Sequence, residues 1–214
     1  MAIKPILFNT EMVRAILDGR KDATRRIVKG FIPDDAVWGY TAFTPKGYIS
    51  CRGTFADGYG EKFFKLPCES GDILYVRETW MDYAGLTMYK ADCDIYRLDS
   101  LNFAGFVWHP SIHMPKGAAR IWLKVTDVRV ERLHDITPKG AESEGVGNLF
   151  YDDIGYGEKN YGTEVDPEYG IAKEQFAWLW ESTIKKSDLD RYGWDANPYV
   201  WVIEFELCEK PEGV

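Results

Sequence analysis

The C-terminal segment 199–207 carries the most regular pattern in the chain. Every odd-numbered position is a large apolar or aromatic residue, and the even-numbered positions are two valines followed by Glu204 and Glu206. Alternation with a period of two is typical of a β-strand that packs one face against a core. The segment therefore predicts a strand whose buried face is formed by Tyr199, Trp201, Ile203, Phe205 and Leu207.

Two further segments predict strands. In 71–80 the apolar run is nearly continuous, as in a strand that is buried on both faces. In 119–133 the apolar residues alternate as far as Val125 and then shift by one position after Thr126 and Asp127. A shift of one residue indicates a β-bulge, or a bend between two strands.

Helical patterns are short. Asn9, or the threonine after it, can cap a helix that ends at Gly19. Thr137 and the proline that follows it predict the start of a short second helix, which ends near 144–145. Apolar residues between 172 and 180 predict an amphipathic third helix.

The chain has 214 residues, which fits one large domain, or at most two small ones. A chain of this length buries enough surface to fold without a disulfide or a structural metal. Strands grouped around few helices predict an α+β fold, a small twisted β-barrel with helices packed outside. We expect a single domain over 1–214 with two insertions. The segment 30–70 predicts loops with short strands, and 145–170, with six glycines, predicts a long surface loop.

The four cysteines are scattered, and no two of them stand at the Cys-x-x-Cys spacing of a zinc knuckle or a redox motif. Such usage is typical of reduced thiols in a cytoplasmic protein. The sequence shows no targeting segment and no apolar run approaching the length of a transmembrane helix. We therefore expect a cytoplasmic protein that does not associate with a membrane.

The formal net charge is −8, and it is unevenly distributed. Residues 1–30 carry seven Lys or Arg against three acidic residues, which leaves −12 for the remainder. Because non-specific coating of nucleic acid needs a broad basic surface, this distribution argues against binding of long duplex DNA. A small basic site on an acidic body suits one nucleotide or a short anionic ligand. The alternative is that these charges only solvate a helix end.

Lys21 and Thr24 stand three residues apart, at the start of a segment that we expect to be extended. A threonine hydroxyl becomes a nucleophile when a neighbouring base takes its proton. Lysine can be that base when burial or nearby cations lower its pKa, and Arg20, Arg25 and Arg26 supply the cations. A carboxylate would complete the set by passing protons to the leaving group. Spacing alone leaves open the alternative of a surface lysine and a strand threonine.

Three segments carry a resemblance to a known family. They are Gly-Arg-Lys-x-x-Thr-x-Arg at 19–26, Gly-Asp-Ile-Leu-Tyr-Val at 71–76 and Tyr-Val-Trp-Val-Ile-Glu-Phe at 199–205. In this order they resemble the ASCH family, a branch of the PUA-like barrels. The first motif is the most specific, and the three together span most of the chain. With Trp-His-Pro-Ser-Ile-His-Met-Pro at 108–115, the chain is similar to ASCH proteins encoded by bacteriophages and prophages.

The resemblance implies an activity as well as a PUA-like fold. Small bacterial members of the family are amidohydrolases that deacylate N4-acetylcytidine, with a threonine nucleophile, a lysine activator and a glutamate proton shuttle. The threonine and the lysine match Thr24 and Lys21. The family's glutamate lies in a short helix beginning Thr-x-x-x-Ala-Glu-x-Glu, which matches 137–144 and points to Glu144.

Several alternatives stay open in this comparison. Glu142 and Glu78 are the other candidates for the proton shuttle. The small amidohydrolases have a threonine directly after the lysine, whereas this chain has Asp22, an acid that would hold Lys21 charged. Other family members bind or cleave RNA, so the alternative function is a non-catalytic RNA-binding module, or a ribonuclease using the same basic cleft.

The expected ligand is a small modified nucleoside or nucleotide, and RNA is the alternative partner. Arg20 or Arg26 is the candidate for stabilising an oxyanion or binding a phosphate. Among the many aromatic residues, Trp80 and Trp108 lie near matched segments and are candidates for stacking on a base, and Glu78 is a further candidate binding residue.

No metal site and no cofactor are expected. His109 and His113 are four residues apart, but Pro110 lies between them. A proline at that position argues against the continuous helix that a histidine pair of this spacing needs to bind zinc.

Overall fold

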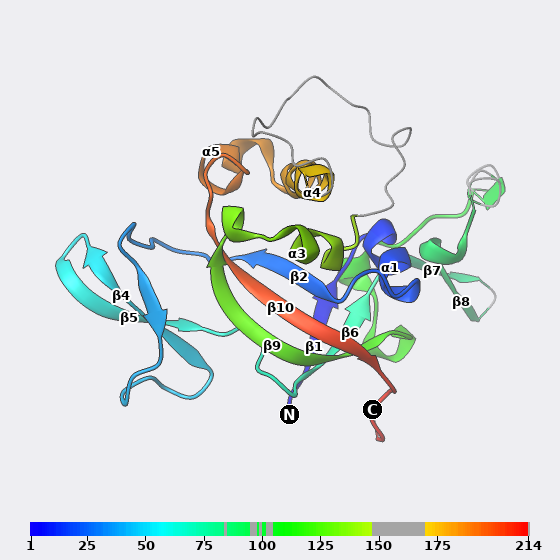
Figure 1. The fold of residues 1–214 in the computed structure, drawn as a ribbon. Helices are drawn as coiled ribbons and strands as arrows, with labels where there is room; N and C mark the ends of the chain where they lie inside the picture. The colour runs from blue at the N-terminus through cyan, green and yellow to red at the C-terminus, as the bar shows by residue number, and fades with distance from the viewer. Residues whose placement is uncertain (84, 95–97, 99, 102–104, 147–169, 214) are drawn as a thin grey trace.

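The computed structural model describes residues 1–213 except 84, 95–97, 99, 102–104 and 147–169 (Figure 1). The described residues form a mixed α+β structure, as the sequence predicts. Its centre is a five-stranded sheet with the order β1-β6-β9-β10-β2. In that order the strands are Ile3–Leu7, Ile73–Arg77, Trp122–Arg132, Tyr199–Cys208 and Ala23–Ile27.

The long strands β9 and β10 form the middle of this sheet. They pair antiparallel along their whole length, with one shift of register between Glu204 and Phe205. Glu204 lies opposite Asp127 and Phe205 lies opposite Val125, so Thr126 is the extra residue of a bulge. The register change predicted at this point is confirmed. β2 pairs antiparallel with β10, whereas β1 pairs in parallel with β6.

The strand predicted at 71–80 is divided into two. Its first part, β6, ends at Arg77, opposite the last residue of its partner β1. The chain then leaves the sheet, and Trp80–Tyr83 forms β7, which pairs with β8 at Leu86–Tyr89.

α-Helices occur at Thr10–Leu17 (α1), Pro138–Ser143 (α3), Gly170–Thr183 (α4) and Leu189–Tyr192 (α5). The Asn9 side chain accepts a hydrogen bond of 2.8 Å from the N–H of Met12 and caps α1, and Gly19 follows that helix at φ +70°. Thr137 caps α3 by accepting the N–H of Gly140 at 3.0 Å. The three helices predicted from the sequence are therefore confirmed. Short 3-10 turns occur at Lys90–Asp92, Ser111–His113, Lys116–Ala118, Leu133–Asp135 and Lys186–Asp188.

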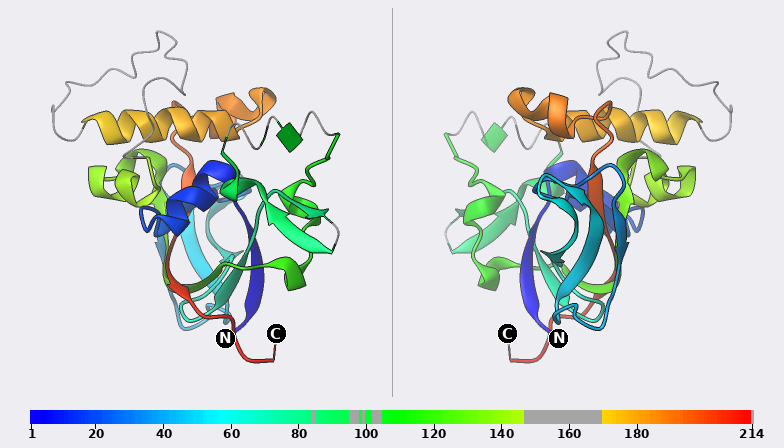
Figure 2. Two further views of the ribbon diagram at one scale, coloured as in Figure 1. Left: turned by 90° about the vertical axis from the view of Figure 1, so that its right-hand side faces the viewer. Right: turned by 90° about the vertical axis from the view of Figure 1, so that its left-hand side faces the viewer.

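Helix α4 crosses one end of the central sheet and lies over α3, while both chain termini lie at the other end (Figure 1, Figure 2). β10 is therefore covered on both faces near this end. Trp201 and Ile203 belong to the main core with residues of α1, and Val200 and Val202 pack with residues of α3 and α4. This second contact explains why the even-numbered positions at the start of β10 are apolar.

A second sheet projects from the side of the molecule, with β3 at Val37–Gly39, β4 at Tyr48–Phe55 and β5 at Gly58–Lys65. The prediction of loops with short strands for 30–70 is wrong, because β4 and β5 each have eight residues. In β4 Gly53 interrupts the apolar alternation of the buried face, and β5 has no buried residue and therefore no apolar alternation. At Gly53 a Cβ would lie 2.8 Å from the ring of Pro33, so close packing excludes a side chain there.

No closed barrel is formed by the residues that the structure describes, and β1 and β2 are the edges of an open sheet. The helices do pack outside this sheet, as predicted. The surface loop predicted at 145–170 lies almost entirely outside the described residues. None of the described helices is long and apolar enough to span a membrane.

Candidate active site

The basic motif turns from the end of α1 into β2. The N–H of Lys21 donates to the carbonyl of Ala15 at 3.1 Å and closes this turn. Along β2 the side chains alternate, so Thr24 and Arg26 share one face of the strand and Arg25 lies on the other.

Lys21 is buried, and three oxygen atoms hold its ammonium group. Its Nζ lies 2.7 Å from Oε2 of Glu144, 3.0 Å from the carbonyl oxygen of the same residue and 2.8 Å from the carbonyl oxygen of Ala23. The ring of Phe8 lies 5.5 Å from Nζ. Glu144 is only 3% exposed, so the ion pair is shielded from water.

Gly145 makes this close approach possible. Its φ of +89° is in the left-handed region, and a Cβ would lie 2.8 Å from Cβ of Ala15 and 3.2 Å from Cβ of Lys21. Both conformation and space therefore favour glycine. The preceding residue, Glu144, forms an isolated β-bridge with Lys21. The end of α3 is thereby fixed against the end of α1.

Burial lowers the pKa of Lys21 below its usual value of 10.5, because the ammonium form loses its hydration. The charge and hydrogen bond of Glu144 raise this pKa, whereas the charges of Arg26 and Arg25 lower it further. The net direction is downward, which favours the neutral amine that a general base requires.

Asp22 does not supply the counter-charge that the sequence suggested. Its side chain is exposed, and within the described residues it makes no ion pair with Lys21. The backbone of Asp22 instead connects two elements, since its N–H donates to Ser143 and its carbonyl accepts from Phe205. The partner of Lys21 is Glu144.

Thr24 is fully buried, and its hydroxyl has no hydrogen-bond partner among the described residues. A buried polar group without a partner costs about 1–3 kcal/mol, and a chemical role is one of the explanations for such a group. In this structure the hydroxyl is not bonded to Lys21. The predicted lysine and glutamate are therefore in direct contact, and the predicted nucleophile is close in sequence but unengaged.

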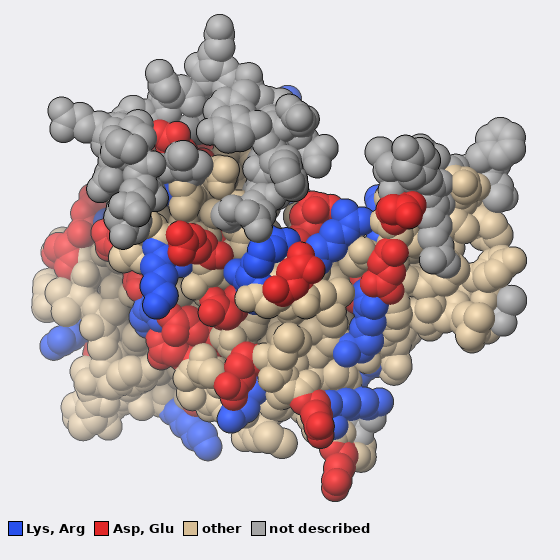
Figure 3. Space-filling model, turned by 45° about the vertical axis from the view of Figure 1, so that its right-hand side comes forward, with Lys and Arg blue, Asp and Glu red and all other residues tan. Residues whose placement is uncertain are grey.

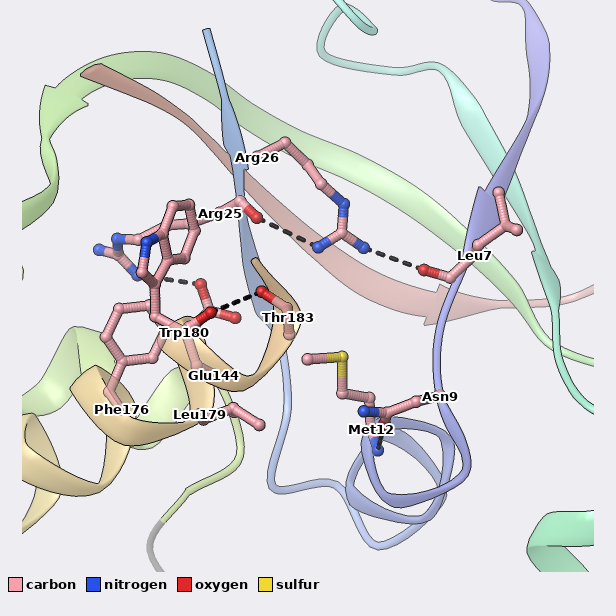
Figure 4. A pocket seen from close by; sticks show the side chains of 10 residues that line it. All are labelled: Leu7, Asn9, Met12, Arg25, Arg26, Glu144, Phe176, Leu179, Trp180 and Thr183. Carbon is pink, nitrogen blue, oxygen red and sulfur yellow. Dashed lines mark hydrogen bonds and ion pairs between the residues drawn. The ribbon is translucent and has the colours of Figure 1, made fainter. Parts of the chain in front are cut away.

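A cavity of about 220 Å³ lies beside Glu144 (Figure 4). Its polar wall is formed by Glu144, Arg25 and Arg26. Neither Lys21 nor Thr24 lines it. The remaining wall comes from the end of β1, from α1 and from α4, and consists of Leu7, Asn9, Met12, Phe176, Leu179, Trp180 and Thr183.

Arg26 is placed at this wall by backbone carbonyls. Its Nη1 donates to the carbonyl of Arg25 at 3.1 Å and its Nη2 to that of Leu7 at 3.0 Å (Figure 4). Its guanidinium lies 5.3 Å from the ring of Phe8. No carboxylate of the described residues forms an ion pair with it, so Arg26 is a cation available to an anionic group in the cavity.

The sequence did not identify the residues of α4 as part of a site. Phe176 and Trp180, four positions apart, belong to the apolar residues that predict the helix over 172–180, and both are buried. They also form the wall opposite Arg26. A helical stripe cannot distinguish a side chain that fills a core from one that borders a cavity within it.

The structure places the other predicted substrate-binding residues elsewhere. Glu78 is buried against Arg120, with contacts of 2.9 and 3.1 Å, and it does not line the cavity. The ring of Trp80 lies 5.2 Å from that of His109, at an interplanar angle of 43°. The indole N–H groups of Trp80 and Trp108 are buried without a partner among the described residues, but neither residue lines the cavity at Glu144.

Two further candidates are also separate from the cavity. Arg20 donates to the carbonyl of Gly145 at 3.0 Å and pairs with Asp18 at 2.9 Å. Glu142 is exposed on α3. Of the three carboxylates considered for the proton shuttle, only Glu144 contacts Lys21.

The expected basic patch is largely neutralised. Five of the seven cations in residues 1–30 form ion pairs with carboxylates of the described residues, and Arg26 and Lys29 do not. Figure 3 shows Lys and Arg side chains intermixed with Asp and Glu over this side of the molecule. Of these two cations Arg26 lines the cavity and Lys29 does not, so an electrostatic site at the cavity is as small as one guanidinium.

His109 and His113 do not form a histidine pair on one helix. Pro110 precedes a 3-10 turn at Ser111–His113, and the described residues contain no group of three or more His, Cys, Asp and Glu side chains suited to a metal ion.

Comparison of the chain with protein-family models, with curated proteins and with solved structures found no match.

Proposed function

We propose that this protein is an amidohydrolase that deacylates N4-acylated cytidine-type nucleosides or nucleotides. The sheet with its outer helices would then be related to the PUA-like barrels of the ASCH kind, in one domain, although its described strands do not close into a barrel. The observation that carries the proposal is the buried contact between Lys21 and Glu144, formed just before strand β2, where the hydroxyl of Thr24 has no hydrogen-bond partner among the described residues. These are the three residues to which the resemblance to the ASCH family points.

The roles follow from the chemistry of the groups. Thr24 Oγ1 attacks the acyl carbon while neutral Lys21 takes its proton, and a tetrahedral oxyanion forms. Lys21 passes that proton to Glu144, 2.7 Å away, which donates it to the departing cytosine amine. Water then cleaves the threonine ester by the reverse proton route. Arg26 is the cation available to the oxyanion or to a substrate phosphate.

The cavity beside Glu144 suits the base and its sugar. Glu144 protonates the amine in this scheme, so the cytosine belongs on the side of the site that Glu144 lines. Trp180 and Phe176 provide aromatic surface there, and such surface favours stacking of a base. Because Thr24 is buried and does not line the cavity, the reaction requires a change of conformation that opens its hydroxyl to the substrate.

A panel of acylated substrates tests the proposal. N4-acetylcytosine, N4-acetylcytidine and its 5′-monophosphate are incubated with the protein, and release of the deacylated product is followed by chromatography. We expect turnover of at least one of them, and none with Thr24→Val. If none of the three substrates is hydrolysed at any pH, the proposal that the protein is an amidohydrolase is wrong.

One observation supports the alternative of an RNA-binding module. Arg26 borders the cavity without an acidic partner in the described structure, as a residue that binds a phosphate would. A binding module would retard a short RNA in a gel, and lose this with Arg26→Gln, while hydrolysing nothing. A ribonuclease using the same residues would cleave that RNA.

A further inference from the structure

Arg25 is a buried cation that connects two carboxylates from different elements. It is 4% exposed. Its Nη1 donates to Oε1 of Glu144 at 3.2 Å and lies 3.4 Å from the carbonyl oxygen of Gly140. Its Nη2 lies 3.5 Å from Oε2 of Glu131, on β9. The guanidinium is also 5.7 Å from the ring of Phe176, which covers it from α4.

The connection continues from Glu131 to the surface. Arg129 Nε donates to Oε1 of Glu131 at 2.5 Å, and its Nη1 contacts Asp127 at 2.8 Å and Glu204 at 2.6 Å. These three acidic residues and Arg129 are between a quarter and a half exposed. The charges therefore alternate from the buried ammonium to solvent, in the order Lys21, Glu144, Arg25, Glu131, Arg129 and finally Asp127 and Glu204.

We propose that Arg25 is a positioning residue of the site, which fixes the Glu144 carboxylate against Lys21 by anchoring it to Glu131. Its consequence for catalysis rests on the proposed function. Its consequence for the protonation of Lys21 does not, because that depends only on the contacts described. None of the residue patterns behind the proposed activity assigns this role to Arg25.

Both oxygens of Glu144 are occupied in this arrangement, Oε2 by Lys21 and Oε1 by Arg25. The carboxylate can therefore not turn away from Lys21 without losing a charged contact. A guanidinium remains charged at any pH that the fold survives, and its planar fork can hold two carboxylates at once. A lysine at this position would supply the charge but could not hold both partners.

Arg25 also acts on the charge state of Lys21. The charged groups around that amine are Glu144 from the end of α3 and Arg25 and Arg26 from β2, and on the remaining side it faces the ring of Phe8. The positive charge of Arg25 disfavours a second positive charge nearby and lowers the pKa of Lys21. Arg25 also pairs with Glu144 and partly neutralises its carboxylate, so the negative charge of Glu144 stabilises the ammonium form of Lys21 less than it would without Arg25.

Two substitutions test this in opposite directions. In Arg25→Gln a positive charge that repels the ammonium of Lys21 is removed, and the carboxylate of Glu144 is no longer shared with an arginine. Lys21 should therefore titrate at higher pH than in the wild type. In Glu131→Gln, Arg25 keeps its charge but loses its outer partner, so Lys21 should titrate at lower pH. Arg132→Gln is the matched control, since it removes one positive charge from β9 where the arginine pairs with Asp34.

The first measurement is an NMR titration of ¹³C-labelled lysine side chains in the full protein, with the Lys21 resonance assigned by its loss in Lys21→Met. The second is kcat/KM for N4-acetylcytidine as a function of pH. We expect the acid limb of activity to move with the Lys21 titration in each variant. For Arg25→Gln we also expect a loss of about 10–100-fold at neutral pH, as a misplaced catalytic group produces.

The outcomes separate the two proposals. Equal Lys21 titrations in the wild type, Arg25→Gln and Glu131→Gln would overturn the role of Arg25, whatever the activity. If the Lys21 titration shifts in opposite directions in the two variants while the wild type hydrolyses no acylated cytidine, the role of Arg25 is retained and the proposed reaction is rejected. If Arg25→Gln does not fold, Glu131→Gln and Arg25→Lys carry the test. Arg25→Lys should keep the titration near the wild type but lose activity, and a normal rate would overturn the positioning role.

Discussion

The Nζ atom of Lys21 lies 2.7 Å from Oε2 of Glu144, and the two side chains are 0% and 3% exposed. The two residues are 123 positions apart in the sequence, and their contact joins the end of α1 to the end of α3. When one partner of a buried ion pair is removed, the folded protein is strongly destabilised, because the other charge remains buried without a counter-charge. This contact therefore has measurable consequences for stability as well as for chemistry.

A double-mutant cycle on this pair should show strong coupling. Lys21→Met and Glu144→Gln should each lower the free energy of unfolding by about 3–5 kcal/mol. The double mutant should lose clearly less than the sum, with a coupling of about 0.5–3 kcal/mol, because neither charge is then left alone. Urea unfolding followed by circular dichroism gives all four free energies.

The exposed pair Lys124 and Glu206 provides the control for this cycle. Its atoms are 3.2 Å apart, but both side chains are more than half exposed. A pair of this kind contributes at most about 1 kcal/mol. Equal coupling energies in the two cycles would contradict the claim that burial strengthens the coupling between Lys21 and Glu144.

Lys21 should contribute a measurable pH dependence to the free energy of unfolding. Its pKa in the folded protein lies below 10.5, so between that lowered pKa and pH 10.5 the unfolded chain binds more protons than the folded one. The lysine therefore contributes an unfolding free energy that rises with pH across this window and is lost as the pH falls through the folded pKa. Lys21→Met should remove this rise.

Other groups act in the opposite direction over part of that range. Burial raises the pKa of the Cys51 and Cys68 thiols from 9.0 to about 11, so their contribution to stability falls as pH rises between these values. Both variants share these thiols. The difference between the wild type and Lys21→Met therefore isolates the lysine, and a pH-independent difference would show that its pKa is not lowered.

Gly145→Ala should damage both the fold and the site. The new methyl group would approach Ala15 to 2.8 Å in a left-handed conformation, and it would press on Lys21. We expect a loss of stability of about 1–3 kcal/mol from strain and overpacking. Gly47→Ala is the control, because Gly47 also has a positive φ but no atom within 4 Å of the added carbon. If the two variants lose the same stability, close packing at Gly145 is not the cause.

The elements that carry the site could be predicted because their signals are local. Asn9 and Gly19 mark the ends of α1, and the shift after Thr126 marks the bulge in β9, each within a few residues of sequence. The second sheet could not be predicted, since Gly53 is required by contact with Pro33, twenty residues earlier. A contact between residues this far apart in the chain produces no periodic pattern in the sequence.

One contact of the candidate site could be anticipated from the sequence. The resemblance to the ASCH family points to Lys21 and Glu144, and the structure places their side chains in contact, although no local pattern brings them together. Closeness in sequence to a matched strand makes Trp80 a candidate for stacking, but Trp80 does not line the cavity, whereas Trp180 reaches it through the packing of α4. Closeness along the chain is a poor guide to a site built from several elements.

Filling the cavity should block substrate without harming the fold. Leu179 is half-buried and lines the cavity of about 220 Å³ from α4. Leu179→Trp adds aromatic bulk to this space, so KM for the nucleoside should rise by about 10–200-fold, in the range of steric discrimination in a pocket. Leu86→Trp adds the same bulk at an exposed position on β8 and should leave KM unchanged. An unchanged KM in Leu179→Trp would show that the substrate binds elsewhere.

Thr24→Val should separate chemistry from stability. The substitution replaces a buried hydroxyl, which has no partner among the described residues, by a methyl group of similar size. Because that hydroxyl stabilises nothing in the resting fold, the free energy of unfolding should stay within about 1 kcal/mol of the wild type or increase. Turnover of acylated cytidine should be lost, since valine offers no nucleophile. Thr87→Val, on the exposed strand β8, is the matched control for the loss of a hydroxyl. Full activity in Thr24→Val, measured by product release under single-turnover conditions, would show that Thr24 does not attack the substrate.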